Sequence, residues 1–320
     1  MSTIPSRKDI VDITEQIFRD EPEIVLMGDF THGTKECHIF RAELTKYLIE
    51  NHHVRCIVVE WDVQDIIECN KYIHDTTSYT NADDLLIDNI TRWPYFMWCH
   101  QQFADMLDWL LEWNLSVSRS EDTVQIYGMD LYGKDKVIPS EDIEEENQEL
   151  AIINRKIQKR LLDKNDTDAG WNQRDSHMAK VIRTIREDYR AEDIMVVWAH
   201  NNHVIKKLKF GKTVGSILNK QYSIFSIATC GKSGKFITAS EWDSSEVIEN
   251  LPKITKNSWE EALLDKRKNN KSCVPSCTYR LRDMGAVTDI KDKIDDQLTT
   301  IPTQFDIIYH INQTSPIDVL

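Results

Sequence analysis

Residues 24–33 hold the stretch that decides the fold, Ile24-Val25-Leu26-Met27-Gly28-Asp29-Phe30-Thr31-His32-Gly33. An apolar run with little alternation predicts a strand that is buried on both faces, as in parallel sheets. The run stops abruptly at an acid and a histidine. Because ligands of open α/β sheets bind outside the carboxyl ends of the strands, Asp29 and His32 are the first candidates for a functional site.

Three later stretches repeat this pattern of an apolar run that ends in polar side chains. They are residues 55–59, 123–128 and 194–199. The polar residues that follow them are Glu60, Asp130, His200 and His203. Since the carboxyl ends of parallel strands lie at one edge of a sheet, we expect all these side chains to converge on one cleft, which indicates an enzyme.

Amphipathic helices follow the first two strands. Apolar residues recur at helical spacing over residues 35–51, and a second helix is predicted over residues 63–72. This alternation predicts an α/β fold with a mostly parallel central sheet flanked by helices. We expect one domain spanning residues 1–320, with helical insertions at about 76–120 and 140–190 that form a wall or lid over the cleft. Further strands are expected at 222–228, 235–239 and 304–311.

The composition is that of an ordinary globular protein, with 41 % hydrophobic and 29 % charged residues. A formal net charge of −14 argues against a nucleic-acid partner, since binding phosphate requires a basic face. No apolar run approaches the ~18 residues that span a bilayer, and the N-terminus lacks the apolar core of a secretory signal. The 7 cysteines show no framework spacing, as expected for reduced thiols in a cytoplasmic protein.

The residues at the strand ends suit acid–base chemistry. A carboxylate such as Asp29 can bond to one ring nitrogen of His32 and raise the basicity of the other, which is what a general base for water activation needs. Glu60 can orient a histidine in the same way or act as a second acid or base. His200 and His203 can stabilise an oxyanion or protonate a leaving group.

Two further features bear on this chemistry. Arg41, in the helix after the first strand, offers a fixed positive charge to a carboxylate or to a developing oxyanion. The same donors also suit a metal ion, so spacing alone leaves metal-free catalysis and a bound divalent metal both open. The candidate ligands for such a metal are His32, Glu60, His200 and His203.

Aromatic residues near the strand ends are candidates for a substrate pocket, because ligand pockets are rich in aromatic side chains. Core packing is the simpler interpretation of each tryptophan taken alone. The substrate-binding candidates are Trp93, Trp98, Tyr127, Asp130, Trp171 and Arg174, with Tyr132 beside them. The other histidines lie off the strand ends and are interpreted as hydrogen-bonded structural residues: His38, His52, His53, His74, His100, His177 and His310.

Two common classes of enzyme are disfavoured by missing motifs. The chain contains no Gly-x-Ser-x-Gly, the nucleophile elbow of many serine hydrolases. No Gly-x-Gly-x-x-Gly follows the first strand and no P-loop occurs, which argues against nicotinamide and nucleotide chemistry.

Several blocks, in order along nearly the whole chain, resemble the erythromycin esterase family. They are Gly28-Asp29-Phe30-Thr31-His32-Gly33-Thr34-Lys35-Glu36, Val58-Val59-Glu60-Trp61, Tyr127-Gly128-Met129-Asp130, Arg174-Asp175-Ser176-His177-Met178, Trp198-Ala199-His200-Asn201-Asn202-His203-Val204 and Phe305-Asp306-Ile307-Ile308-Tyr309-His310-Ile311. The resemblance implies an α/β hydrolytic fold unrelated to the serine esterases. Its resistance members cleave the lactone of macrolide antibiotics, and others are described as succinoglycan biosynthesis proteins.

The resemblance also implies roles for individual residues. His32 matches the general base of the family, Glu60 a required acid and Arg41 a required arginine. His200 and His203 match the second pair of histidines. One departure is Asp29, because the family usually has Glu there, and the shorter side chain must reach its partners differently.

We therefore expect a cytoplasmic hydrolase that cleaves an ester or lactone of a secondary metabolite by His-activated water. Its partner would be a small-molecule substrate, with no cofactor, nucleic acid or membrane involved. The alternatives are a biosynthetic acyl transferase or cyclase that uses the same base on an alcohol or amine, and a non-catalytic ligand- or metal-binding member of the fold. The sequence leaves the substrate and the oligomeric state open.

Overall fold

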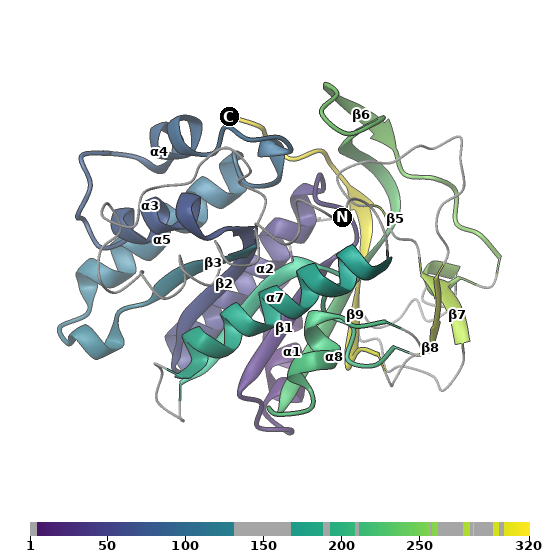
Figure 1. Cartoon of the computed structure of the whole chain (residues 1–320), viewed down its shortest axis with the longest axis horizontal. Helices are drawn as coiled ribbons and strands as arrows, with labels where there is room; N and C mark the ends of the chain where they lie inside the picture. Colours follow the sequence, from purple (N-terminus) through teal and green to yellow (C-terminus); the bar gives the residue numbers. More distant parts are fainter. Residues whose placement is uncertain are drawn as a thin grey trace.

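The structure is a computed structural model of the whole chain (Figure 1). It describes residues 5–130, 168–187, 193–208, 211–256, 258–261, 278–281, 284, 297–300 and 304–320. The insertion expected at about 140–190 is therefore described mainly by one helix, and Tyr132 lies outside the described residues. The side chain of Trp171 also lies outside them.

Helices flank the strands as the sequence predicts. The α-helices are α1 (Arg7–Ile17), α2 (Lys35–Asn51), α3 (Val63–Tyr72), α4 (Ala82–Asn89), α5 (Gln101–Ser116), α7 (Asp168–Glu187) and α8 (Val214–Leu218). Two short 3-10 helices are η1 (Tyr95–Met97) and η2 (Ser120–Asp122). Within the insertion expected at about 76–120 lie α4, η1 and α5.

A seven-stranded sheet forms the centre of the molecule. The strands are β1 (Ile24–Asp29), β2 (Val54–Asp62), β3 (Gln125–Asp130), β4 (Ile194–His200), β5 (Ile224–Ala239), β6 (Glu246–Asn250) and β9 (Ile307–Thr314). The order β3-β2-β4-β1-β5 is parallel throughout, β9 adds to β5 in parallel, and only β6 is antiparallel. The predicted mostly parallel α/β fold is confirmed. A separate two-stranded ribbon joins β7 (Thr278–Leu281) to β8 (Gln297–Thr300).

The central strands are buried because helices cover both faces of the sheet. Every residue of β1, β2 and β4 is buried, which explains their unbroken apolar runs. One apolar core joins the sheet to α1, α2 and α5, and the other joins it to α7 and α8, which cross in front of the strands in Figure 1. Each fully buried Ile, Leu or Val stabilises this arrangement by about 1.5–3 kcal/mol, so the layers fix the strand ends firmly.

The strands at the β5 side of the sheet differ from those predicted from the sequence. The strands predicted at 222–228 and 235–239 are one continuous strand, β5, because its middle residues pair with β9 although they are polar or glycine. The late strand begins at Ile307 and reaches Thr314, three residues beyond its expected end. β6 was not predicted, since three of its five residues are exposed and its apolar pattern is weak.

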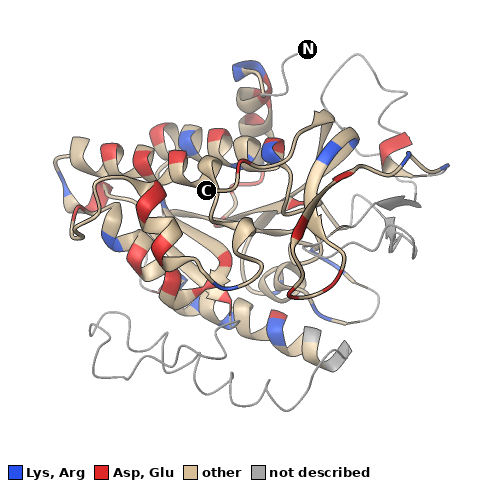
Figure 2. Cartoon of the chain, turned by 90° about the horizontal axis from the view of Figure 1, so that it is seen from above, with Lys and Arg blue, Asp and Glu red and all other residues tan. Residues whose placement is uncertain are grey.

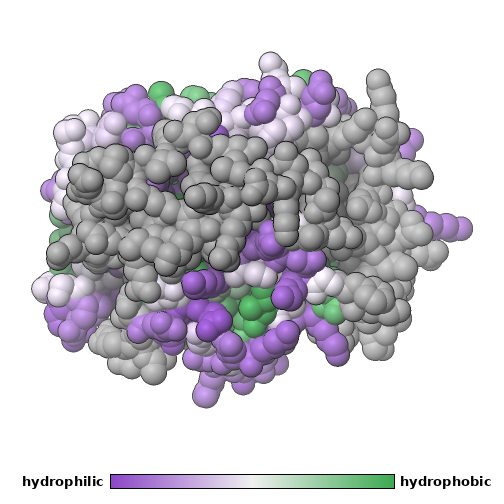
Figure 3. Space-filling view, viewed as in Figure 1, coloured by the Kyte–Doolittle hydropathy of each residue, from purple (hydrophilic) through white to green (hydrophobic). Residues whose placement is uncertain are grey.

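In the view of Figure 3, hydrophilic residues predominate on the described part of the surface, and a smaller hydrophobic patch lies near the lower centre. Within the described part of the chain, no helix combines the length and the apolar character needed to cross a membrane.

Candidate active site

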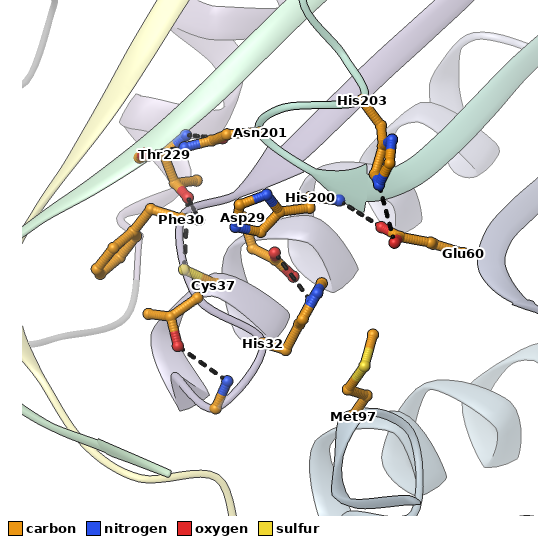
Figure 4. A network of polar contacts seen from close by, with 12 residues as sticks. Asp29, Phe30, His32, Cys37, Glu60, Met97, His200, Asn201, His203 and Thr229 are labelled. Carbon is orange, nitrogen blue, oxygen red and sulfur yellow. Dashed lines mark hydrogen bonds and ion pairs between the residues drawn. The ribbon is translucent and has the colours of Figure 1, made fainter. Parts of the chain in front are cut away.

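The sheet register brings three strand ends together. Asp29, the last residue of β1, is the direct neighbour of His200, the last residue of β4. On the other side of β4, Val59 of β2 is opposite Trp198, so Glu60 lies near the end of β4 as well. Figure 4 shows these side chains around one point at the carboxyl edge of the sheet, as the sequence predicts.

Asp29 lies between a histidine and an arginine. Its Oδ1 atom is 3.2 Å from Nδ1 of His32, and its Oδ2 atom is 2.9 Å from Nη1 of Arg41. Burial alone would raise the pKa of Asp29, but the charges of His32 and Arg41 outweigh it and lower that pKa below its usual value. The carboxylate therefore stays anionic and holds the His32 ring.

Arg41 supports Asp29 from inside the protein. Its side chain is only 1 % exposed, and its guanidinium carbon lies 5.7 Å from the ring centre of Trp98 and 5.2 Å from that of Trp198. Both distances are within the range of a cation–π contact. Of the two roles considered for Arg41, the geometry favours pairing with a carboxylate.

Two histidines behind Arg41 complete this support. Because an arginine can only donate, Arg41 Nη2 donates to Nδ1 of His38 over 3.0 Å. The other ring nitrogen, Nε2, then donates to the carbonyl oxygen of His32 over 3.1 Å. His100 packs against His38 with ring centres 4.1 Å apart. Burial, together with nearby charges, lowers the pKa of His38 well below its ordinary value and that of His100 to about 3, so both rings are neutral.

Glu60 accepts hydrogen bonds with both carboxylate oxygens. Oε2 accepts the backbone N–H of His200 over 2.7 Å, and Oε1 accepts Nη2 of Arg174 over 2.7 Å. Nε2 of His203 lies 3.1 Å from the same Oε1 atom. Burial would raise the pKa of Glu60, but His203 and Arg174 hold it well below its usual value.

Arg174 ties the sheet to α7. It contacts Asp130, the last residue of β3, through two bonds: Nε to Oδ1 over 3.0 Å and Nη2 to Oδ2 over 2.6 Å. A planar two-bond contact of this kind fixes orientation as well as charge. One guanidinium thereby connects the ends of β2 and β3 through Glu60 and Asp130.

The centre of the cluster is a pair of facing histidines. The rings of His32 and His200 have centres 5.1 Å apart and planes inclined by 57°. Met97 of η1 flanks them in Figure 4. The site thus presents two imidazoles, each next to an anionic carboxylate, at the edge where α/β sheets bind ligands.

A family comparison bears on this arrangement. The erythromycin esterase family model matches residues 49–145 and 135–314. The chain belongs to the erythromycin esterase family. The match includes the strand ends of Glu60, Asp130 and His200, whereas the block around Asp29 and His32 precedes it.

Solved structures share the fold at low identity. The crystal structure of a succinoglycan biosynthesis protein superposes with a TM-score of 0.78 at 18 % identity, over 100 % of this chain and 95 % of that chain. A protein from Bacillus cereus gives 0.73 at 18 % identity with the same coverage. A mutant of the erythromycin esterase EreC in its open conformation gives 0.64 at 15 % identity, over 97 % of this chain and 95 % of that chain.

The aromatic candidates divide between core and rim. Trp98 is buried and donates its Nε1–H to the carbonyl oxygen of Glu60 over 3.1 Å, so it stands behind the site. Trp93 is half-buried and packs edge-on against Trp242 of the β5–β6 hairpin, with ring centres 4.6 Å apart. Tyr127 is half-buried on β3 and packs against the core under α7 and α8.

Three supporting residues were not among the predicted site residues. His38 and His100 are hydrogen-bonded structural residues, as interpreted, but nothing in the sequence indicates that they support Arg41. Asp175 bonds to His203 Nδ1 over 2.9 Å, and its place beside Arg174 in a family block was the available signal.

The four candidate metal ligands contact other protein groups in the described residues. Across these ranges, no three His, Cys, Asp or Glu side chains are grouped so that they could hold a metal ion. His32 instead contacts Asp29, and Glu60 contacts His203, Arg174 and the His200 backbone.

Proposed function

We propose that this chain hydrolyses a carboxylic ester or lactone with a water molecule that His32 deprotonates. The observation that carries the proposal is the His32 ring, whose Nδ1 lies 3.2 Å from the buried Asp29 and whose centre lies 5.1 Å from the His200 ring. Since Nδ1 faces the carboxylate, Nε2 is the ring nitrogen left to act as a base. Membership of the erythromycin esterase family supports the reaction class.

The proposed reaction needs only water, the ester and the side chains of the site. Nε2 of His32 removes a proton from water while the water oxygen forms a bond to the ester carbonyl carbon, and the carbonyl electron pair moves onto its oxygen. His200 stabilises the resulting oxyanion. When the tetrahedral intermediate collapses, the carbon–oxygen bond to the leaving group breaks, and the proton on His32 passes to the leaving alkoxide. The products are an acid and an alcohol, in one molecule if the substrate is a lactone.

The proposed substrate is a small uncharged or weakly charged molecule, and no cofactor is required. Acidic residues are prominent on the helices drawn in Figure 2, in line with 53 Asp and Glu against 39 Lys and Arg. Such a surface repels polyanions and therefore disfavours a nucleic-acid substrate. The charges around Asp29 and Glu60 lower the pKa of both carboxyl groups, so the proposed scheme has two anionic carboxylates at the site without a metal ion.

The test is a screen of p-nitrophenyl esters, simple lactones and erythromycin in ¹⁸O-labelled water, with and without EDTA. Hydrolysis places one ¹⁸O atom in the acid product, and the rate should not depend on EDTA. An acid product without label would favour acyl transfer, and loss of activity with EDTA would favour a metal enzyme.

His32→Gln supplies the matched test of the base. General-base catalysis contributes about 10²–10⁴-fold, so kcat should fall by that factor while circular dichroism stays unchanged. His52→Gln is the control, because His52 is stacked on Phe18 at the end of α2, and it should keep full activity. A His32→Gln protein with normal kcat would exclude the proposed mechanism.

A further inference from the structure

Asp175 is a buried carboxylate that the reaction scheme does not use. It lies in α7 and is only 3 % exposed. Its Oδ1 atom is 2.9 Å from Nδ1 of His203, and its Oδ2 atom accepts the backbone N–H of Val214, the first residue of α8, over 2.9 Å. Because one oxygen is anchored to the main chain, the position of the other is fixed, and with it the direction of the bond to His203.

His203 therefore lies between two carboxylates. Nε2, on the far side of the ring from Asp175, is 3.1 Å from Oε1 of Glu60. Arg174 of α7 approaches the same nitrogen with Nη1 at 3.0 Å while its Nη2 contacts the same Glu60 oxygen. Burial would lower the pKa of His203, but Asp175 and Glu60 raise it to about 10.

The charged groups around His203 come from three elements. Asp175 and Arg174 belong to α7, Glu60 belongs to β2, and Asp130 of β3 acts through its two bonds to Arg174. The three carboxylates carry more negative charge than the single guanidinium carries positive charge, so the surroundings of His203 favour its protonated form. A ring bonded at both nitrogens is poorly placed to pass a proton to a leaving group.

We propose that Asp175 is a positioning residue that fixes the His203 ring through Nδ1, so that Nε2 is held next to the Glu60 carboxylate beside His200. In this arrangement His203 orients Glu60, and because both of its ring nitrogens are engaged it does not donate the proton to the leaving group. The role assigned to Asp175 rests on the proposed hydrolysis. Its contact with His203 is independent of that proposal and can be tested without a substrate.

The kinetic test is Asp175→Asn, which keeps the shape of the side chain and removes its charge. Loss of a group that orients a metal-bound histidine costs about 10–100-fold in activity, and Asp175 orients His203 in the same way. We expect that loss in kcat with KM little changed, because Asp175 does not touch substrate. Asp175→Glu, which keeps the charge, should recover part of the rate.

The matched control is Asp306→Asn. Asp306 also accepts a backbone N–H, that of Ser226 over 2.8 Å, and also pairs with a cation, Lys206. It precedes β9, which is separated from β4 by β1 and β5 in the sheet. The control should lose stability without losing kcat, which separates positioning from general damage to the fold.

A spectroscopic test does not require turnover. The ring ¹⁵N signals of His203, assigned by comparison with His203→Gln, should show a protonated and slowly exchanging Nδ1 in the unmodified protein. In Asp175→Asn the Nδ1 signal should shift and its proton should exchange faster. If the ester screen finds no activity, the proposed function is wrong, but the NMR measurement still shows whether Asp175 bonds to Nδ1 of His203.

A second variant covers the case in which Asp175→Asn does not fold. Val214→Pro removes the N–H that anchors Asp175, at the first position of α8, where proline is tolerated. It should shift the same His203 signal and lower kcat by a smaller factor. Normal kcat in Asp175→Asn, or an unchanged His203 signal in either variant, would overturn the inference.

Discussion

The backbone N–H of His200 donates to Oε2 of Glu60 over 2.7 Å, although the two residues are 140 positions apart. This bond joins the end of β4 to β2, and it orients a carboxylate with the main chain instead of with a mobile side chain. Since Oε1 accepts a hydrogen bond from Arg174, both carboxylate oxygens of Glu60 have a donor. The neighbouring strand ends therefore fix the carboxylate before any substrate binds.

Glu60→Gln should damage both activity and stability. The amide nitrogen would face donors that now bond to an anion, and Arg174 and His203 would lose a buried partner. Breaking a buried ion pair costs about 3–5 kcal/mol, which urea unfolding would detect. The control is Glu68→Gln, because Glu68 forms a partly exposed pair with Lys71 within α3 and should change the unfolding free energy by less than ~1 kcal/mol. Equal unfolding free energies in the two variants would contradict the claim that the buried contacts of Glu60 with Arg174 and His203 stabilise the fold.

Asp29→Glu introduces the residue that the family usually has, yet it should lower activity here. Asp29 is 1 % exposed and in contact with both His32 and Arg41, so an added methylene must displace one of these contacts. Overpacking a buried position typically costs about 1–3 kcal/mol. Initial rates on an ester substrate and the melting temperature should both fall, and Asp29→Asn should lose more activity because it also leaves Arg41 without its anion. Full activity in Asp29→Glu would show that His32 and Arg41 can rearrange to accommodate the longer side chain.

The central sheet and the convergence of its strand ends could be predicted because both depend on local patterns. Unbroken apolar runs identify the inner strands, and the parallel arrangement then places Asp29, Glu60, Asp130 and His200 at one edge. β5 was predicted as two strands, since its middle is polar, largely exposed and held in the sheet by pairing with β9. That pairing joins segments about 80 residues apart and leaves no local signal.

The supporting residues could not be predicted for a related reason. His38 and Asp175 lie on helices, and their partners depend on how each helix is rotated against the sheet. A buried helix position can hold either an apolar side chain that packs or a polar one that forms a hydrogen bond. His38 and Asp175 are of the second kind because Arg41 and His203 lie next to them in the folded protein.

The stability of the protein should fall as pH rises above about 6.5, because of His203. Its pKa is about 10 in the folded protein and about 6.5 in an unfolded chain, so the folded state retains a proton that the unfolded state loses. The contribution is complete below pH 6.5 and is lost on passing pH 10. The expected slope is up to about 1.4 kcal/mol per pH unit.

Urea unfolding between pH 6.5 and 8.5 would measure this slope with little interference from cysteine. The buried Cys37 and Cys99 have pKa values raised to about 12 and about 11, so their effect begins near the unfolded thiol value and lies at higher pH. His203→Gln should be less stable at pH 6.5 but should show a flat profile over this window. The same slope in both proteins would rule out His203 as its source.

Gly33→Ala should prevent His32 from keeping its position. A Cβ atom at residue 33 would lie 1.8 Å from the carbonyl oxygen of Ile237, which is main chain and cannot turn away. Gly33 is also held from two sides, because its carbonyl accepts the N–H groups of Ile237 and Ile317 over 3.0 and 3.2 Å. The alanine must therefore displace either β5 or the loop that carries His32. We expect a large drop in melting temperature together with loss of ester hydrolysis, whereas Ser78→Ala at an exposed loop position should change neither. A Gly33→Ala protein with unchanged melting temperature would mean that β5 does not approach the His32 loop this closely.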